Sequence, residues 1–519
     1  MNDQIFDAPV FMKNVAVVSS YSKYQALVDY AAGIRSTLPF TSADIPSLIH
    51  PKEYVCVQGC VWGTCFNNSC VCFAGYSGVD CSQQLSKPSR ENDCNADIGV
   101  VPNGISDWSS EWSFVNLHLS GRAWISQDFI ASAWSLPTPQ NLSQAGYPRA
   151  LLPTQKLGTM MMRDLRGHMR SGTFICLYDG DGILTFGMDI VAVVLGVGRI
   201  EVKVVPSTGL NNGVFLSIER TNPLDPIRNI RFIMPGFEDT YRHFPFHPMF
   251  LDTMRIYKTI RFMGWQNTNG VTYGSWNDRT ILEKNTRGFS GSVEINGVSG
   301  GGNGVSIEYM ILLANTLGAN AWFNMPHLVT DEHVRNFAIL VNETLRPDVK
   351  IYIEYSNEVW GTLFNGGIYA QQQGLKMGIS TNSGTARFCF YMLRSNQIFA
   401  IWKDVFGGSS RLEFVLSSQA VNPDVTSQYM KCTSVPVGQR LATTLAIAPY
   451  FGSYNQYVDK NFNTFMNKTL PSQIKSLITQ VSGHKRFAKL NNLTLSAYES
   501  GEGMQGSRRD TDFALLAVR

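Results

Sequence analysis

The chain has 519 residues, of which 44% are apolar and 16% charged, so it is too long for one ordinary domain and can bury a large core. Its 43 basic and 40 acidic residues leave a net charge of +3 without a dense basic run, so nothing indicates nucleic-acid binding. The longest apolar run, about residues 190–197, is far shorter than the roughly 20 residues that cross a bilayer. We expect three or four folded parts.

Residues 1–50 carry short apolar runs and a helix-like periodicity at residues 24–34, and no function is assigned to them. The sequence does not begin with a basic region followed by an apolar core, which would mark a secretory signal.

Six cysteines follow within 26 residues, a segment too small for a sufficient hydrophobic core, so we expect disulfides to stabilise it. They are Cys56, Cys60, Cys65, Cys70, Cys72 and Cys81. A zinc site is the competing use of clustered cysteines, but six thiols without a nearby histidine fit four-coordinate zinc poorly.

The spacing of these cysteines, with Gly75-Tyr76-Ser77-Gly78 between the last two, closely resembles an EGF-like module over residues 52–82. The resemblance implies the pairs Cys56–Cys65, Cys60–Cys70 and Cys72–Cys81. Residues 51–55 lack the acidic and amide side chains of the calcium-binding version, so we expect no calcium site. The pairing of Cys94, Cys176, Cys389 and Cys432 remains open among three connectivities.

Disulfides persist in oxidising compartments, so we expect an extracellular or cell-surface protein. Glycosylation acceptors of the type Asn-x-Ser/Thr agree with this location and occur at Asn67, Asn141, Asn342, Asn467 and Asn492. Because no signal is visible, we expect the natural N-terminus to lie upstream of Met1.

Residues 95–222 are predicted to form a small β-sandwich or β-sheet domain. Strand-like residues 173–178 and 183–186 flank Asp179-Gly180-Asp181-Gly182, which predicts a hairpin because glycine supplies the positive φ of tight turns. Residues 200–205 and 214–218 alternate as further strands.

This part is also rich in tryptophan: Trp108, Trp112, Trp124 and Trp134 fall within 27 residues. Exposed tryptophans stack well on sugar rings, but tryptophan more often belongs to a core.

Residues 226–519 alternate between strand-like and helix-like segments, which implies parallel strands joined by right-handed crossovers. The predicted strands are Ile230 to Met234, Thr259 to Met263, Ala321 to Met325, Lys350 to Tyr355, Leu412 to Leu416, Leu445 to Ala448 and Leu493 to Tyr498. The predicted helices include Val305 to Leu317, Asp331 to Thr344 and Ala386 to Val405.

These strands predict an α/β barrel of the (β/α)8 TIM type. Only twenty residues follow Glu499, and residues 511–518 look helical, so the eighth strand is missing and we expect a truncated C-terminus. The fold class is therefore multidomain: a disulfide-rich EGF-like module, a β-rich domain and an incomplete barrel.

The segment Tyr355-Ser356-Asn357-Glu358-Val359-Trp360 ends a predicted barrel strand, where the active sites of such barrels lie. It resembles the acid/base strand of the clan of retaining (β/α)8 glycoside hydrolases that contains many cellulases. In detail the chain is similar to uncharacterised members, some labelled cellulose-binding. This resemblance covers roughly residues 100–510 and implies that Glu358 is the general acid/base and that Glu499, in Tyr498-Glu499-Ser500-Gly501, is the nucleophile. Glu502 is the rival nucleophile.

The resemblance also implies substrate-binding roles for five residues. Arg261 corresponds to the clan's arginine beside the nucleophile, and Asn357 to the asparagine that binds the sugar 2-hydroxyl. Tyr450, His327 and Trp360 occupy strand ends where the clan has aromatic or histidine contacts.

The residues alone add one prediction. Side chains alternate along a strand, so Glu354 should face the barrel interior with Glu358, and Arg261 is its expected partner.

The first hypothesis is thus an extracellular retaining hydrolase of β-linked polysaccharide, with no cofactor and no metal. The alternative is a non-catalytic carbohydrate-binding or adhesion protein, because an EGF-like module favours contact with a matrix or cell surface. A metal-dependent hydrolase lacks the His-x-His and Asp clusters that it would need.

Overall fold

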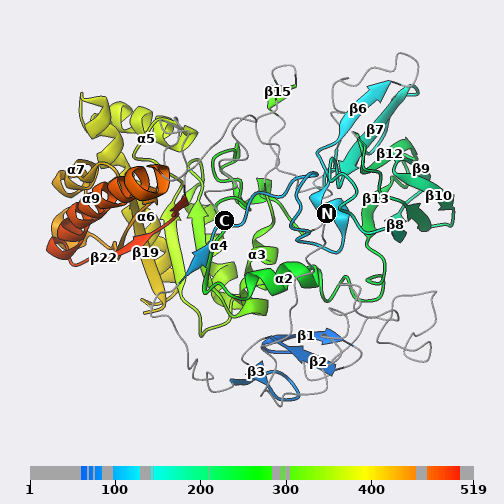
Figure 1. Cartoon of the computed structure of the whole chain (residues 1–519), viewed down its shortest axis with the longest axis horizontal. Helices are drawn as coiled ribbons and strands as arrows, with labels where there is room; N and C mark the ends of the chain where they lie inside the picture. The colour runs from blue at the N-terminus through cyan, green and yellow to red at the C-terminus, as the bar shows by residue number, and fades with distance from the viewer. Residues whose placement is uncertain are drawn as a thin grey trace.

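In a computed structural model of the chain, residues 60–66, 69–73, 76–84, 98–128, 142–143, 145–209, 211–282, 294–295, 298–299, 304–408, 410–451 and 464–502 are described. Figure 1 shows a parallel sheet with its helices on one side of the molecule, two further sheets on the other side, and a small segment with strands β1 to β3 beneath them. Among the described residues, no helix is both long enough and apolar enough to span a membrane.

The largest sheet has seven strands, all parallel, in the order β22-β20-β19-β18-β17-β14-β5. Their bounds are β5 (Gly99–Val100), β14 (Thr259–Arg261), β17 (Asn320–Met325), β18 (Ile351–Tyr355), β19 (Leu412–Ser418), β20 (Thr444–Ile447) and β22 (Thr494–Ala497). The strands lie side by side in the same order as they follow one another in the chain. Each crossover connection therefore leads to the next strand in the same direction across the sheet. Right-handed crossovers of this kind leave the helices on one face.

The helices have the bounds α2 (Pro248–Met254), α3 (Ile307–Leu317), α4 (Asp331–Thr344), α5 (Asn365–Lys376), α6 (Ser383–Val405), α7 (Pro423–Lys431) and α9 (Leu470–Leu490). Helix α3 contacts β17, α6 contacts β18 and β19, and α9 contacts β22. Three of these helices were predicted, and Thr330 and Asn382 cap the starts of α4 and α6 by accepting backbone N–H groups.

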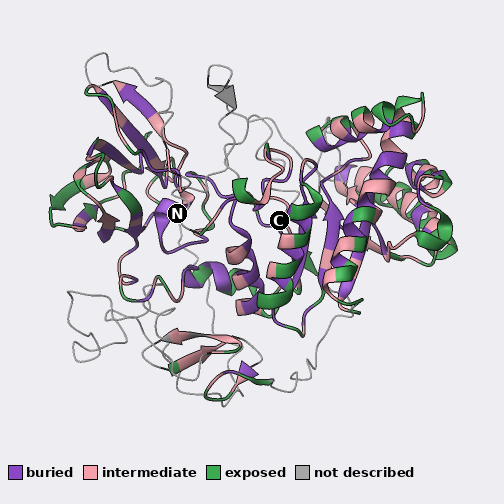
Figure 2. Cartoon of the chain, turned by 180° about the vertical axis from the view of Figure 1, so that it is seen from behind, coloured by how far each residue is buried: buried purple, intermediate pink, exposed green. Residues whose placement is uncertain are grey.

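Alternation along the strands separates the two faces of the sheet. On β18, Ile351, Ile353 and Tyr355 belong to the large core beneath the helices. Tyr352 instead packs with Trp322 in a small cluster on the opposite face. Figure 2 shows the strands largely buried and the outer faces of the helices exposed.

Between β5 and β14 the chain forms two antiparallel four-stranded sheets around a separate core. One sheet, in the order β10-β11-β8-β13, has strands β8 (Gly172–Asp179), β10 (Ile190–Val194), β11 (Arg199–Val204) and β13 (Arg228–Ile233). The other, in the order β6-β7-β12-β9, has strands β6 (Ile125–Asp128), β7 (Gln155–Met161), β9 (Gly182–Met188) and β12 (Val214–Thr221). A β-rich part at this point of the chain was predicted.

One strand prediction was wrong here. The strand Ile230 to Met234, expected in the barrel, belongs up to Ile233 to β13, which pairs antiparallel with β8, while the two-residue β5 takes the edge position beside β14. The alternating pattern predicts a strand but not its partner.

The predicted hairpin around Gly180 does not form, because β8 and β9 belong to different sheets. Gly180 has φ +91, as a turn requires, and a Cβ there would lie 2.2 Å from the carbonyl oxygen of Pro226. The backbone of Asp181 bonds that of Asp225, so the turn packs against another loop and leads from one sheet to the other.

The small segment has strands β1 (Gly63–Phe66), β2 (Ser69–Cys72), β3 (Tyr76–Ser77) and β4 (Gln83–Gln84), which pair as β1-β2 and β3-β4. The disulfides Cys60–Cys70 and Cys72–Cys81 confirm two of the expected pairs. Cys65 is also disulfide-bonded, and its expected partner Cys56 lies outside the described residues.

Further contacts dock this segment against the parallel sheet. The hydroxyl of Tyr76 donates to Oδ1 of Asp348 at 3.1 Å, and the Arg346 guanidinium lies 4.7 Å from the centre of the Tyr76 ring. Because Asp348 precedes β18, the contact is at the amino-terminal edge of the sheet.

A further disulfide, Cys389–Cys432, joins α6 to the end of α7. Cys176 of β8 is a buried free thiol. Cys94 lies outside the described residues, as do residues 1–50 and 511–518.

Candidate active site

The candidate residues lie at the carboxyl ends of strands β14, β17, β18, β20 and β22 of the parallel sheet. Arg261 ends β14, and Glu354 lies near the end of β18. Directly after β18, Ser356 and Glu358 adopt positive φ angles of 57° and 48°. These left-handed residues turn the backbone sharply, a conformation that is uncommon outside glycine and often found at functional sites.

Arg261 is the centre of the site, and its side chain is only 2% exposed. Its guanidinium forms an ion pair with Glu354 (3.0 Å) and another with Glu499 (2.8 Å), and it donates to Oδ1 of Asn357 at 2.9 Å. One planar cation thereby holds two side chains from the end of β18 and one from the loop after β22. Its face also lies 4.9 Å from the centre of the Tyr498 ring.

Glu354 is fully buried and points inward, as predicted, with Arg261 as its partner. It accepts further hydrogen bonds from Trp322 Nε1 and Asn324 Nδ2, both at 2.9 Å. Burial raises the pKa of Glu354, while the charge and hydrogen bonds of Arg261 oppose that rise. Its many donors make Glu354 a support for Arg261.

Glu358 stands in a different environment. Burial raises the pKa of its carboxyl, and the charge of Glu499 adds to the rise, whereas a hydrogen bond from Tyr498 lowers it. The Tyr498 hydroxyl donates to Glu358 Oε1 at 2.9 Å and accepts from the indole N–H of Trp360 at 3.3 Å. The net result is a Glu358 carboxyl whose pKa is raised above its ordinary value.

Glu499 follows β22 and is partly exposed, with 17% of its side chain accessible. Its Oε1 accepts from Arg261, and its Oε2 accepts from the hydroxyl of Tyr450 at 2.8 Å. The short strands β21 (Tyr450–Phe451) and β23 (Gly501–Glu502) pair in parallel and bring these loops together. Each oxygen of the Glu499 carboxyl group therefore has a hydrogen-bond donor, which fixes the orientation of the group.

The remaining predicted residues lie around this centre. His327 is buried at the end of β17, and its ring packs edge-on against Tyr369 of α5, 5.5 Å between centroids. The rival Glu502 belongs to β23, but its side chain lies outside the described part of the chain. Arg261, Asn357, Glu358, Tyr450, Trp360 and Glu499 therefore form one connected group, and His327 stands beside it.

No protein-family model matches the chain, and no curated protein matches its sequence.

Sequence reasoning did not single out four residues that the structure adds. Tyr498 contacts Glu358, and Asn269 contacts Asn357. Trp322 and Asn324 both contact Glu354. Trp322 and Asn324 alternate on β17 with core residues, and this period-two pattern was the available signal. Among the described residues, His, Cys, Asp and Glu side chains do not gather in a group that would hold a metal ion.

Proposed function

We propose that this chain is an extracellular retaining glycoside hydrolase that acts on a β-linked polysaccharide. The supporting observation is the contrast between two neighbouring carboxyl groups. Glu358 is buried with a raised pKa, while Glu499 accepts from Arg261 and Tyr450 through both oxygens. Carboxyl groups in such unlike environments take the separate roles of acid and nucleophile.

In the proposed reaction Glu499 attacks the anomeric carbon while Glu358 gives its proton to the departing glycosidic oxygen. The bond between that carbon and oxygen breaks, and a glycosyl ester on Glu499 forms. Glu358, now ionised, then removes a proton from water, which displaces Glu499 and restores both groups. In this proposal Arg261 stabilises the carboxylate before attack, and Asn357, which is hydrogen-bonded to Arg261, binds the sugar 2-hydroxyl.

The fold agrees with this function. We infer that the seven parallel strands, wound in chain order, are the greater part of a (β/α)8 barrel, since the proposed catalytic residues all follow its strands at the carboxyl edge. We infer likewise that the disulfide-bonded segment is an EGF-like module. Its position at the opposite edge, through Tyr76 and Asp348, leaves the site free and offers a surface for matrix contact.

The test is a hydrolysis screen of the secreted protein against β-glucans, mannans and xylans, followed by Glu-to-Gln variants. Glu358→Gln should lose activity on polysaccharide but keep part of its activity on an activated aryl glycoside, whose good leaving group departs without a proton. Glu499→Gln should lose both activities. Proton NMR of the first product should show the anomeric configuration of the substrate.

Glu332→Gln, an exposed change on α4, is the matched control and should act as the parent does. Inversion of configuration, or a fully active Glu499→Gln, would refute the two-carboxylate assignment. Polysaccharide binding without any turnover would favour the non-catalytic carbohydrate-binding protein instead.

A further inference from the structure

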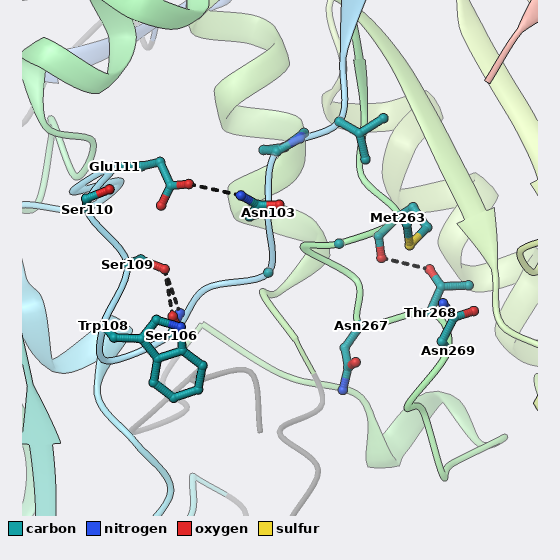
Figure 3. Close-up of a pocket in the computed structure, with 14 residues that line it drawn as sticks. Asn103, Ser106, Trp108, Ser109, Ser110, Glu111, Met263, Asn267, Thr268 and Asn269 are labelled. Carbon is teal, nitrogen blue, oxygen red and sulfur yellow. Dashed lines mark hydrogen bonds between the residues drawn. The ribbon is translucent and has the colours of Figure 1, made fainter. Parts of the chain in front are cut away.

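A pocket of about 520 Å³ opens at the carboxyl ends of β5 and β14, next to the candidate active site. Figure 3 shows its two walls, the loop that follows β5 with Trp108 and Glu111 and the loop that follows β14 with Asn267 and Asn269. The loops approach so closely at Gly264 that a Cβ there would lie 2.5 Å from the carbonyl oxygen of Pro102. The size is typical of small-molecule sites.

The first wall presents an aromatic ring held in place. Trp108 is 45% exposed, and the Arg122 guanidinium carbon lies 5.9 Å from the centre of its ring. Arg122 is itself anchored by a 2.9 Å ion pair with Asp107, whose side chain is only 2% exposed. An indole ring that is already held in place offers its apolar surface to a ligand and loses little conformational entropy on binding.

Polar side chains complete the lining. Nδ2 of Asn103 donates to Oε1 of Glu111 at 3.3 Å, and Asn269 lies on the opposite wall (Figure 3). Amides and a carboxylate offer both donors and acceptors to hydroxyl groups. An aromatic ring with such groups matches a sugar, which has apolar C–H faces and a hydroxyl rim.

Asn269 connects the pocket to the reaction centre. Its Oδ1 accepts a hydrogen bond of 3.3 Å from Nδ2 of Asn357, whose Oδ1 in turn accepts from Arg261. Hydrogen bonds thus link the pocket, through Asn269 and Asn357, to the Arg261 guanidinium.

We propose that this pocket is a further sugar-binding subsite, which takes the unit of the polysaccharide beyond the two that flank the scissile bond at the carboxylates. The Trp108 wall belongs to the connection that leads from β5 into the two antiparallel sheets, β6 to β13, which form an insertion between β5 and β14 (the two-sheet insertion). The proposed substrate chain therefore runs toward that insertion. This inference rests on the proposed carbohydrate substrate, but it concerns binding and does not require turnover.

The experiment compares disaccharides with pentasaccharides of the cello-, manno- and xylo- series by calorimetry, using the Glu499→Gln protein to prevent hydrolysis. Adding Trp108→Ala should weaken pentasaccharide binding roughly three- to tenfold, the range expected for one lost aromatic contact, and should leave disaccharide binding unchanged. Leu224→Ala, which removes a 95% exposed side chain in the insertion, is the control and should change neither affinity. A thermal melt of each variant shows that it is folded.

The outcomes separate the two proposals. Hydrolysis by the parent protein with no selective effect of Trp108→Ala, or an equal loss for both lengths, overturns the subsite and leaves the hydrolase intact. A selective loss in a protein that hydrolyses nothing supports the subsite and overturns the hydrolase. Absence of binding by every oligosaccharide overturns the subsite.

Discussion

The hydroxyl of Tyr498 lies 2.9 Å from Oε1 of Glu358, a residue 140 positions earlier in the chain. The same hydroxyl accepts from Trp360, which fixes its proton toward Glu358. Because Tyr498 directly precedes Glu499, one hydrogen bond sets the position of the proposed acid relative to the loop that carries the proposed nucleophile.

Replacement Tyr498→Phe should shift the alkaline limb of the pH profile of kcat/KM to higher pH. The hydrogen bond favours the ionised form of Glu358 and lowers its pKa, so its loss lets the burial and the Glu499 charge raise that pKa further. The measurement is kcat/KM across pH on a polysaccharide substrate.

The control is Tyr178→Phe, which removes a hydroxyl from strand β8 of the two-sheet insertion. It should leave the pH profile of kcat/KM unchanged. An alkaline limb that stays fixed in Tyr498→Phe, or moves to lower pH, would show that this hydrogen bond does not tune the acid.

Replacement Arg261→Met should lower the free energy of unfolding by about 3–5 kcal/mol, because it leaves the fully buried Glu354 without its counter-charge. Arg228→Met breaks an ion pair whose partners are 49% and 54% exposed, and it should cost less than about 1 kcal/mol. Chemical denaturation of both variants measures the difference. Equal small effects would mean that Glu354 does not carry a charge in the folded protein.

The loss in Arg261→Met should also depend on pH. Burial already raises the pKa of Glu354, and Arg261 holds it down, so removing Arg261 raises it further. A carboxyl with a raised pKa binds a proton more tightly in the folded state, so acidification through that pKa favours folding. The deficit relative to the parent should therefore be largest at neutral and alkaline pH and shrink toward pH 4.5; a constant deficit would contradict this.

The pairing of Glu354 with Arg261 was predictable because it follows from strand alternation and from the need of a buried carboxylate for a cation. The role of β5 was not predictable, because a strand of two residues is too short to show an alternating pattern. Its position in the sheet depends on pairing with Thr259 of β14, which is over 150 residues away in the chain. Nor was the Tyr498–Glu358 bond predictable, because both residues lie beyond regular strands, where alternation no longer fixes side-chain direction.

Replacement Tyr450→Phe should reduce kcat/KM about 10- to 100-fold on an aryl glycoside, because hydrogen bonds to charged groups contribute about 1.5–3 kcal/mol. Its hydroxyl donates at 2.8 Å to Glu499, the proposed nucleophile. Because this hydrogen bond affects the attack of Glu499 on the anomeric carbon, the loss of kcat/KM should be similar for substrates with good and with poor leaving groups. A loss confined to poor leaving groups would place Tyr450 with the acid instead.

The thiol of Cys176 should resist alkylation in the native protein. It is buried in the core of the insertion, and burial raises its pKa to about 12, so almost no thiolate exists near neutral pH. Iodoacetamide at pH 8, followed by peptide mass spectrometry, should leave the Cys176 peptide unmodified until denaturant is added. Rapid labelling of the native protein would show that this core opens readily.

Loss of the Cys389–Cys432 disulfide should destabilise the protein by up to about 4 kcal/mol, the chain-entropy value for its separation of 43 residues. The bridge ties α6, which packs on β18 and β19, to the end of α7, so the destabilisation should fall on the parallel sheet. The measurement is denaturant unfolding of Cys389→Ala/Cys432→Ala and of the parent, each with and without reductant. Reductant should lower the stability of the parent more than that of the variant, which retains the disulfides near the N-terminus. If reductant shifts both proteins equally, the bridge between α6 and α7 contributes nothing, and the folded helices hold their packing without it.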